Sequence, residues 1–348
     1  MRLLICTQTV DRTDPALGFF HRWIEELSVQ CESVVVVCLK EGNHTFPSNV
    51  EVLSLGKEAG TPRLTKIIRF YRYIFSNKNG YDTVLVHMNQ EYVLMGGLFW
   101  KLMGKKVFMW RNHYKGSVFT DLAAAFCTKI FSTSKFSYTA KFKKTVLMPV
   151  GVDIDSANLN IPVERVPRSI LFLARLDDSK RPDLLIQALG ILARHDVQFT
   201  ATIAGGPSDA RSDYLERLRA LAEKEGVAAH IKFVGAVPNP DTFRYYRSHE
   251  IFVNCSRSGM LDKTMFKAVA CGCLVATASR DFAAMVEDPR FIFPEGDAPA
   301  LAERLVGLLG LSHEQREVAE VHLQKILAQQ SLPALMVQLS HEMRTPAA

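Results

Sequence analysis

Two stretches in the second half of the chain combine cationic side chains with turn residues and a helix start. In the stretch 254–279, NCSRSGMLDKTMFKAVACGCLVATAS, a small-residue loop leads to Asp262 and Lys263, and Lys267 follows one helical turn later. In the stretch 174–189, ARLDDSKRPDLLIQAL, Arg175 and Lys180 precede a predicted helix. Arginine, lysine and the N–H groups at a helix start all bind phosphates in proteins. The sequence therefore predicts a diphosphate site; a solvated basic loop and a helix capped by Asp262 are the alternatives.

Glycines and histidines follow several other predicted strands. Gly205 and Gly206 follow the run FTATIA, and Gly18 follows the first strand. Glycine at a strand end permits close approach of a ligand to the backbone, and a plain turn is the alternative. His113 and His87 lie at the ends of the runs KVFMWRNH and DTVLVHM, where either could donate a hydrogen bond to a substrate oxygen. A histidine satisfied by nearby backbone is an equal interpretation for His113 and the better one for His87.

Short apolar runs rich in β-formers alternate with amphipathic segments along the chain. This alternation is typical of parallel sheets joined by crossover helices. The eleven runs are too many for one comfortable open sheet, so we predict two doubly wound, Rossmann-like α/β domains that face a cleft. The strand candidates are RLLICTQ, SVVVVCL, DTVLVHM, KVFMWRNH, KIFSTS, TVLMPVG, SILFLARL, FTATIAGG, IKFVGAV, EIFVNCS and CLVATAS.

A polar segment with two prolines, NLNIPVERVPR at 158–168, predicts the boundary between the domains. We predict an N-terminal domain over 1–160 and a C-terminal domain over 161–330. The remaining residues, 331–348, are predicted to form a helix that packs back on the N-terminal domain.

Several classes of protein lack support in the sequence. No run of 18 uncharged apolar residues occurs among the 348 residues, so no transmembrane helix is expected. The start, MRLLICTQTVDRTD, lacks a small-residue cleavage site, so a secretory signal is not expected. A G-x-G-x-x-G motif after the first strand, a G-x-S-x-G motif and a Walker loop are all missing. The seven cysteines predict buried free thiols in a reducing compartment.

Two patterns could in principle bind a metal. Asp153 and Asp155 have a spacing that can hold a divalent ion beside a diphosphate, but they lie just before the predicted linker, and we interpret them as loop residues. Cys271 and Cys273 lack a second pair that would complete four ligands, so packing is the better interpretation. No metal is expected.

Positive charge is concentrated in the first half of the chain. Residues 1–150 hold 20 Lys and Arg against 11 Asp and Glu, whereas the rest hold 22 against 25. The segment TPRLTKIIRFYRYIFSNKNG predicts a basic amphipathic helix, which could lie on an anionic membrane or be a packed helix with a solvated basic face. Its basic residues and three further surface lysines are Arg63, Lys66, Arg69, Arg72, Lys141, Lys143 and Lys144.

The order of these motifs resembles the donor-binding domain of the retaining group 1 glycosyltransferases (family four), which have the GT-B fold. In the N-terminal half the likeness rests on Gly18 in the first loop and on His113, where the family keeps a histidine. The matching segments are ILFLARLDDSKRPDLLIQAL, ATIAGGP, IKFVGAVPNPDTFRYYRSHEIFVNCS and DKTMFKAVACGCLVATAS, with MPVGVDIDS matching the end of the acceptor domain.

The resemblance implies transfer of a sugar from a nucleoside-diphosphate sugar, with retained configuration and without a metal or another cofactor. Arg175 and Lys180 would hold the diphosphate, Gly18 would lie near the leaving phosphate, and His113 would lie near the donor sugar. His113, Arg175 and Lys180 are thus the predicted catalytic residues. The residues predicted to bind the donor are Gly18, Gly205, Gly206, Val234, Val237, Ser258, Gly259, Asp262, Lys263, Thr264 and Lys267.

The expected partners are a nucleoside-diphosphate sugar and a glycan or lipid-linked acceptor of the cell envelope or a polysaccharide. An anionic membrane surface is a further candidate partner through the basic N-terminal domain, and nucleic acid is not expected. The resemblance implies a cytoplasmic enzyme, with attachment to the inner face of the membrane left open.

One departure from the family pattern concerns two carboxylates. The family usually carries two glutamates eight positions apart where this chain has Gly259 and Lys267; some members carry Asp-Lys in the loop, as Asp262 and Lys263 do here. The second glutamate would accept hydrogen bonds from the ribose, and a lysine has no acceptor. A non-catalytic relative that binds a nucleotide sugar, or an epimerase-like enzyme acting on one, is therefore the alternative.

Overall fold

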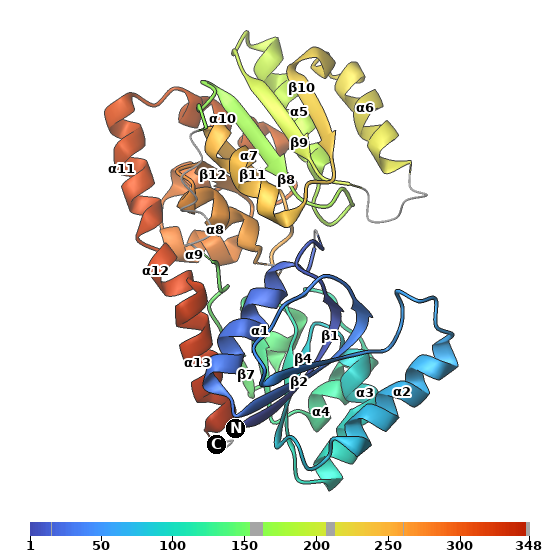
Figure 1. The fold of residues 1–348 in the computed structure, drawn as a ribbon. Coiled ribbons are helices and arrows are strands. Elements are labelled where there is room, and N and C mark those ends of the chain that lie inside the picture. Colours follow the sequence, from blue (N-terminus) through green and yellow to red (C-terminus); the bar gives the residue numbers. More distant parts are fainter. Residues whose placement is uncertain (15, 154–162, 207–212, 260, 346–348) are drawn as a thin grey trace. The chain divides into compact units, whose positions relative to one another are not determined.

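The chain folds into two α/β units in a computed structural model (Figure 1). The structure describes residues 1–14, 16–153, 163–206, 213–259 and 261–345. Unit 1 comprises Met1–Pro149 and Pro333–Ala348, and unit 2 comprises Val150–Leu332. The predicted boundary at 160/161 falls among residues outside the described ranges, as does part of the predicted linker.

Unit 1 contains a parallel sheet of seven strands in the order β3-β2-β1-β4-β5-β6-β7. The order reverses between β1 and β4, which is the switch point of a Rossmann-like sheet. The elements, in chain order, are β1 (Arg2–Val10), α1 (Phe19–Gln30), β2 (Ser33–Glu41), β3 (Val50–Ser54), α2 (Arg63–Ser76), β4 (Thr83–His87), α3 (Gln90–Leu102), β5 (Lys106–Trp110), α4 (Val118–Phe126), β6 (Lys129–Ser132), η1 (Tyr138–Lys141) and β7 (Thr145–Leu147).

Unit 2 contains a parallel sheet of five strands in the order β10-β9-β8-β11-β12, with its switch point between β8 and β11. The elements are β8 (Ser169–Leu173), α5 (Pro182–Arg194), β9 (Thr200–Ala204), α6 (Tyr214–Lys224), η3 (Ala228–His230), β10 (Ile231–Gly235), η4 (Asn239–Asp241), α7 (Thr242–Ser248), β11 (Ile251–Asn254), α8 (Lys263–Ala270), β12 (Leu274–Thr277), α9 (Arg280–Val286), η5 (Pro289–Phe291), α10 (Ala298–Leu309), α11 (His313–Gln324) and α12 (Leu327–Gln330).

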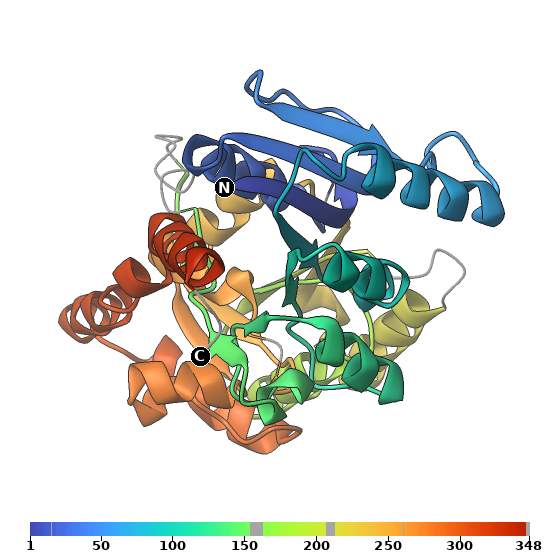
Figure 2. The same ribbon diagram turned by 90° about the horizontal axis from the view of Figure 1, so that it is seen from below.

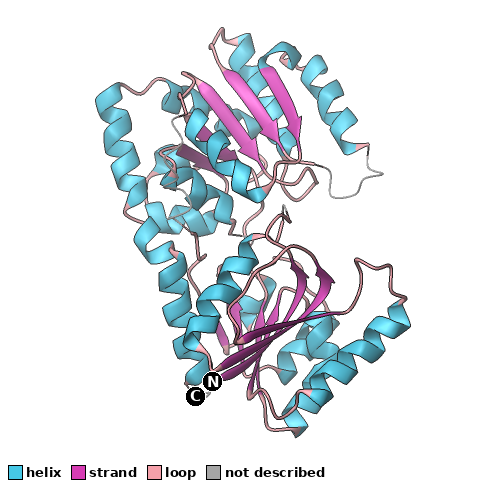
Figure 3. Cartoon of the chain, viewed as in Figure 1, coloured by secondary structure: helices cyan, strands magenta, loops and turns pink. Residues whose placement is uncertain are grey.

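The predicted fold class, α/β with two doubly wound Rossmann-like units, is confirmed by these two strand orders (Figure 3). The sequence predicts this class because the central strands are nearly continuous apolar runs, as expected for strands buried on both faces. In β2, for example, five successive residues from Val34 to Cys38 are buried. All eleven predicted strands occur, but β3 was missed, since its VEVLS sequence is short and half polar.

Alternate side chains of the first sheet pack against different helices. Leu4 and Val84 point into the core that α2, α3 and α4 cover. His87 lies on the opposite face, where its ring stacks on Phe20 of α1 with 3.8 Å between centroids. α3 lies between α2 and α4 in both views of this unit (Figures 1 and 2).

The final helix, α13 (Leu332–Arg344), belongs almost entirely to unit 1. Lys129 Nζ lies 2.7 Å from Glu342 Oε2, and Arg344 Nη2 donates to the Gln30 carbonyl at 2.7 Å. These contacts join residues more than 200 positions apart. They hold the C-terminal helix against α1 and β6.

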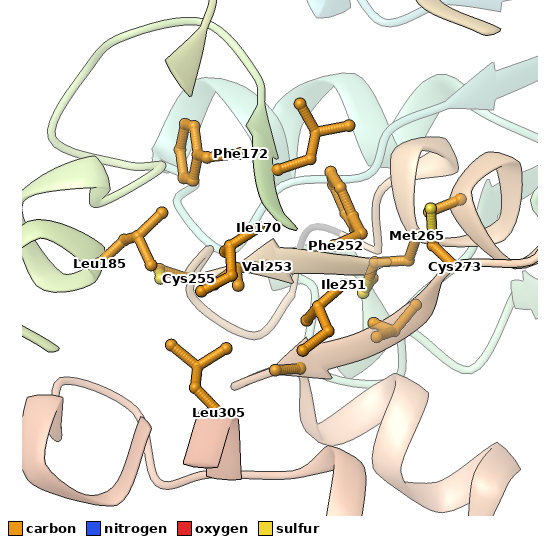
Figure 4. Close-up of a cluster of buried hydrophobic side chains, with 14 of the residues drawn as sticks. Ile170, Phe172, Leu185, Ile251, Phe252, Val253, Cys255, Met265, Cys273 and Leu305 are labelled. Carbon is orange, nitrogen blue, oxygen red and sulfur yellow. The ribbon is translucent and has the colours of Figure 1, made fainter. Parts of the chain in front are cut away.

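The core of unit 2 fills the space between its sheet and the surrounding helices. Ile170 of β8, Phe252 of β11 and Met265 of α8 are fully buried there, together with Leu185 of α5 (Figure 4). Packing of this kind fixes the strand ends and helix starts that form the site described below. No helix in the described parts of either unit is long and apolar enough to cross a membrane.

Candidate active site

The switch point of the second sheet brings two loops to one edge. β8 ends at Leu173, and the loop after it leads to α5 at Pro182; β11 ends at Asn254, and the loop after it leads to α8 at Lys263. β8 and β11 are parallel neighbours, so both loops leave the carboxyl edge of the sheet. This is the place where open α/β sheets bind their ligands.

The loop between β8 and α5 is shaped by Asp177. Its Oδ1 accepts from the Ser179 N–H at 2.9 Å, and its carbonyl accepts from the Lys180 N–H at 3.0 Å. Arg181 then takes a left-handed conformation, with φ of 55°, and Pro182 begins α5 at a position where a missing N–H does no harm. The turn directs Lys180 inward and leaves Arg175 near the strand end.

Lys180 forms an ion pair with Asp262 across the two loops. Its Nζ lies 2.6 Å from Asp262 Oδ2, and only 7% of Lys180 is exposed. The same oxygen accepts from Ser256 Oγ at 3.0 Å and from Asn254 Nδ2 at 3.3 Å. The structure thus brings together two predicted site residues that are 82 positions apart. The carboxylate holds the ammonium group in one place at the switch point.

Asp262 occupies the N-cap position of α8, but its side chain does not cap the helix. Its carboxylate instead accepts hydrogen bonds from the side chains of Lys180, Asn254 and Ser256. The first N–H groups of α8 therefore donate no hydrogen bond to this carboxylate. Close by, Thr264 Oγ1 is buried without a hydrogen-bond partner among the described residues. The start of α8 keeps the donors that could bind an anion.

Arg175 is the exposed member of the predicted diphosphate pair. Its side chain is 60% exposed, and its Nη2 lies 3.9 Å from Asp177 Oδ2, which is too long for a hydrogen bond. The guanidinium group is accessible at the strand end. Its role in binding stays a prediction.

Gly205 is required by the protein's own packing, and Gly206 beside it is closely packed. Gly205 has a φ of +152°, and a Cβ there would lie 1.8 Å from the Ala174 carbonyl oxygen. A Cβ on Gly206 would lie 3.2 Å from Ala236 Cβ, and its carbonyl accepts from the Leu176 N–H at 2.9 Å. The close approach that the sequence predicted is therefore made by neighbouring backbone. Approach of a ligand is untested.

The remaining predicted donor-binding residues of the second unit lie around the same edge. Val234 and Val237 are half-buried and pack against the unit 2 core. Ser258 Oγ accepts from the Arg280 N–H at 3.2 Å. Gly259 has a φ of 91°, so the loop needs a glycine there. These contacts explain the loop's shape without deciding its ligand.

Lys263 and Lys267 lie one turn apart on α8. Lys263 Nζ donates to the Gly151 carbonyl at 3.0 Å, and Lys267 Nζ donates to Asn239 Oδ1 at 2.7 Å. Lys267 is 8% exposed, and its amine lies 5.1 Å from the centroid of the Phe243 ring. Burial lowers the pKa of Lys267 to about 8, and burial together with the neighbouring Lys267 charge lowers the pKa of Lys263 well below its ordinary value.

A hollow of about 400 Å³ lies at the carboxyl edge of the first sheet, beyond β4 and β5. Arg111 Nη2 donates to the Lys115 carbonyl at 3.1 Å, while Arg111 Nε is buried without a partner among the described residues. Met88 is held at a φ of 70°, a conformation that non-glycine residues seldom adopt. The lining residues are Met88, Asn89, Arg111, Asn112, His113, Lys115, Gly116 and Ser117.

His113 lines this hollow, but it is not part of a strand. β5 ends at Trp110, so the predicted run KVFMWRNH was three residues too long. The His113 ring accepts at Nδ1 from the Lys115 N–H at 2.9 Å and stacks on Tyr114. His87, by contrast, ends β4 and is buried, with its Nδ1 3.3 Å from Thr7 Oγ1. The interpretation of His87 as a satisfied core histidine agrees with these contacts.

Gly18 lies between the first loop and α1. A Cβ there would lie 2.6 Å from the Asp14 carbonyl oxygen and 2.7 Å from that of Arg12. Its φ of −55° is ordinary, so the close approach of the loop backbone is what requires glycine. The loop itself is held by Asp14 Oδ1, which accepts from the N–H groups of Ala16 and Leu17.

Residues 167–310 match the family model of the group 1 glycosyl transferases. The match contains both loops of the second sheet and the ion pair between Lys180 and Asp262. Over these residues the chain is similar to the group 1 glycosyltransferases. Within the matched residues, Arg175 and Lys180 lie on the first loop, Asp262 ends the second loop, and Lys263 and Lys267 lie on α8.

Several curated relatives of this chain share one name. The D-inositol 3-phosphate glycosyltransferase of Acidothermus cellulolyticus is 32% identical over 155 residues, which cover 40% of this chain and 34% of that protein. The protein of the same name from Corynebacterium jeikeium is 29% identical over 210 residues, covering 54% of this chain and 50% of that protein. The match thus spans about a third to a half of the length of these relatives.

The crystal structure of HepE from Anabaena in complex with UDP-glucose has a similar fold. Its TM-score is 0.77 at 16% identity, and the alignment covers 97% of this chain and 98% of HepE. Identity this low shows the fold alone. It supports the GT-B fold class for the chain as a whole.

Several polar residues of the candidate site were not predicted from the sequence. Asn254 and Ser256 bind the Asp262 carboxylate, and Asn239 binds the Lys267 amine. Asn254 could have been predicted as a site residue, because it is the last residue of a strand at the switch point. Nothing local to Asn239 indicates its partner, which lies 28 positions away on α8.

Proposed function

We propose that the chain transfers a sugar, with retention of configuration, from a nucleoside-diphosphate sugar to a glycan or lipid-linked acceptor of the cell envelope. The single observation that carries this proposal is the Lys180–Asp262 ion pair beside the start of α8. It lies at the switch point of a group 1 glycosyltransferase domain. A diphosphate bound there would meet a fixed ammonium group and helix N–H donors.

The chemistry needs stabilisation of a leaving anion. The bond between the sugar C1 and the diphosphate oxygen breaks, and a bond from C1 to the acceptor hydroxyl oxygen forms, with release of the hydroxyl proton. Negative charge develops on the departing diphosphate, and fixed donors lower the barrier by stabilising it. Lys180, Arg175 and the start of α8 would supply these donors, each charge-assisted bond contributing roughly 1.5–3 kcal/mol. This proposal assigns that stabilisation to side chains and helix N–H groups and includes no metal.

The donor and acceptor classes draw support from the comparisons and from the first unit. HepE was solved with UDP-glucose, which supports a nucleotide-sugar donor. The hollow lined by Arg111, His113 and Lys115 offers cationic and polar groups at the carboxyl edge of the first sheet. We place acceptor recognition in that hollow. His113 is proposed to act on the donor sugar, as the resemblance implies.

A cytoplasmic location is part of the same proposal. All seven cysteines are buried free thiols, as a reducing compartment permits. Burial raises the pKa of the Cys31 thiol to about 11, which makes it a poor nucleophile. None of these thiols is assigned a chemical role.

The test is release of nucleoside diphosphate from a panel of UDP-, GDP- and ADP-sugars, with Lys180→Met as the site variant. We expect kcat/KM to fall about 100-fold, the effect of removing one fixed donor to a developing anion. Lys180→Arg keeps the charge and should retain more activity than Lys180→Met. Lys224→Met is the matched control, because Lys224 is an exposed lysine of the same unit. The proposal fails if no donor is turned over or if Lys180→Met equals the wild type.

A second candidate function is a non-catalytic nucleotide-sugar-binding protein. The observation that favours it is Lys267, whose amine donates to Asn239 where the family usually has a carboxylate acceptor. This candidate predicts saturable binding of UDP or a UDP-sugar by calorimetry with no product in the same panel. Turnover by the wild type rules it out.

A further inference from the structure

The outer face of α2 carries an apolar stripe that is largely exposed. Leu64 and Ile68 are 68% and 59% exposed, and Phe75 is 40% exposed. Their spacing of four and seven residues places all three on one face of the helix. The inward face is formed by Phe70 and Ile74, which are fully buried in the core under α2. The helix is therefore apolar on two faces, and only one of them is covered by its own unit.

The stripe continues onto α3. The rings of Phe75 and Phe99 lie 5.4 Å apart, edge to face, so the two helices touch at this point. On α3, Leu98 and Leu102 are 51% and 76% exposed and lie one turn apart. We call the set Leu64, Ile68, Phe75, Leu98 and Leu102 the α2–α3 surface.

Basic side chains border the α2–α3 surface. α2 carries four basic residues and no acidic one. Arg72 is exposed one turn after Ile68, and Lys101 is exposed one turn after Leu98. Arg63, at the start of α2, is exposed as well, while Arg69 turns inward to the Leu55 carbonyl at 3.2 Å. The acidic residue on these two helices is Glu91, at the opposite end of α3 from Leu102.

We propose that the α2–α3 surface binds the headgroup region of an anionic lipid bilayer. Leucine, isoleucine and phenylalanine on one helix face, bordered by arginine and lysine, form the pattern of helices that lie in the plane of a membrane interface. The apolar side chains would enter the acyl boundary, and the basic side chains would contact anionic headgroups. Charge complementarity favours this occupant over a second copy of the chain, because two identical basic surfaces would repel each other.

This inference goes beyond the proposed sugar transfer and does not depend on it. The α2–α3 surface contains none of the residues assigned to catalysis or donor binding. A protein without transferase activity could still bind membranes, and a transferase could fail to do so. The two proposals are therefore tested by different measurements.

The test is co-sedimentation of the full chain with lipid vesicles. Wild-type protein should bind phosphatidylcholine vesicles that contain about 30% phosphatidylglycerol, bind pure phosphatidylcholine vesicles far less, and detach as salt screens the charges. Leu64→Gln with Ile68→Gln should lower the partition coefficient about tenfold, since both side chains lose their apolar contact. Arg63→Gln with Arg72→Gln should lower it by about fivefold for each charge. All four positions are exposed, so the variants should fold.

The control is Val318→Gln with Val321→Gln on α11. These valines are 60% and 59% exposed, so the change is of the same kind in the other unit. We expect the control to bind vesicles like the wild type. The proposal is overturned if the wild type ignores anionic vesicles, or if the control loses as much binding as the α2 variants. It is also overturned if, without lipid, Leu64→Gln with Ile68→Gln dissociates a protein complex that the wild type forms.

Discussion

Lys180 and Lys267 are two buried lysines of the same unit in opposite electrostatic surroundings. Lys180 lies 2.6 Å from the Asp262 carboxylate, which two further side chains also bind. Lys267 lies 2.7 Å from the neutral amide oxygen of Asn239 and faces an aromatic ring. A buried charge with a bonded counter-charge is held in place, whereas one bonded to a neutral group keeps most of its desolvation penalty. The charge of Asp153 offsets this penalty at Lys267 only in part, since burial is the larger cause of its lowered pKa. The first lysine suits a binding site, and the second lowers the stability of the fold.

The largest expected effect is that of breaking the Lys180 pair. Asp262→Asn leaves the buried ammonium group with neutral partners, and we expect unfolding free energy to fall by about 3 kcal/mol. Chemical denaturation followed by fluorescence would measure it. Glu303→Gln is the matched control, because Glu303 pairs with Arg304 on the surface and is 71% exposed. That change should alter stability by less than about 0.5 kcal/mol.

A double variant separates the loss of the ion pair from the burial of a single unpaired charge. Lys180→Met combined with Asp262→Leu removes both charges, so neither is left buried alone. We expect the double variant to be more stable than Asp262→Asn, although it should lose donor turnover. Equal stability of Asp262→Asn and the wild type would show that the pair does not hold the loops together.

Replacing Lys267 should raise the stability, which is the opposite of the effect of Asp262→Asn. Lys267→Met removes a buried cation whose hydrogen bond goes to a neutral amide, and near pH 7 we expect the unfolding free energy to rise by about 2 kcal/mol. Burial lowers the pKa of Lys267 to about 8, which is 2.5 below the ordinary 10.5. At about 1.4 kcal/mol for each unit, that shift costs the wild type about 3 kcal/mol. Loss of the bond to Asn239 offsets about 1 kcal/mol of the gain.

The pH dependence of this gain follows from the same shift. Between about pH 8 and 10.5 the unfolded chain binds more protons at Lys267 than the folded chain, so this lysine destabilises the wild type less as pH rises. The advantage of Lys267→Met should therefore be full below pH 8 and nearly gone above pH 10.5. Thermal melts of variant and wild type at matched pH would measure it, with exposed Lys224→Met as control. A gain that stays constant across this range would contradict the assignment.

Local sequence patterns were enough to predict the two sheets and the loops that meet at their edges. Apolar runs such as SVVVVCL carry the strand signal, and parallel topology then places the following loops together. The ends of strands were harder to predict. β5 stops at Trp110 although Arg111, Asn112 and His113 continue without a breaker, because hydrogen bonding to the neighbouring strand decides where pairing ends.

The chemistry of each lysine could not be predicted from its neighbours in the sequence. Lys180, Lys263 and Lys267 were all assigned to the donor, yet their amines meet Asp262, Gly151 and Asn239 at separations of 82, 112 and 28 residues. Contacts of this length depend on the folded topology. The sequence therefore identifies candidate cations, and the fold decides which group each of them contacts.

The smallest effect is expected from a substitution of Arg175. It tests whether this exposed cation contributes to ligand binding without contributing to the stability of the fold. Its side chain is 60% exposed and makes no short ion pair with Asp177, so Arg175→Gln should leave stability unchanged within about 0.5 kcal/mol. Its loss should still lower kcat/KM for the nucleotide sugar about tenfold, or about 1.4 kcal/mol, if the guanidinium binds the diphosphate. Arg194→Gln is the control, since Arg194 is 59% exposed in the same unit. A variant at Arg175 that turns over the donor as fast as this control would leave Lys180 and the start of α8 as the whole of the proposed diphosphate site.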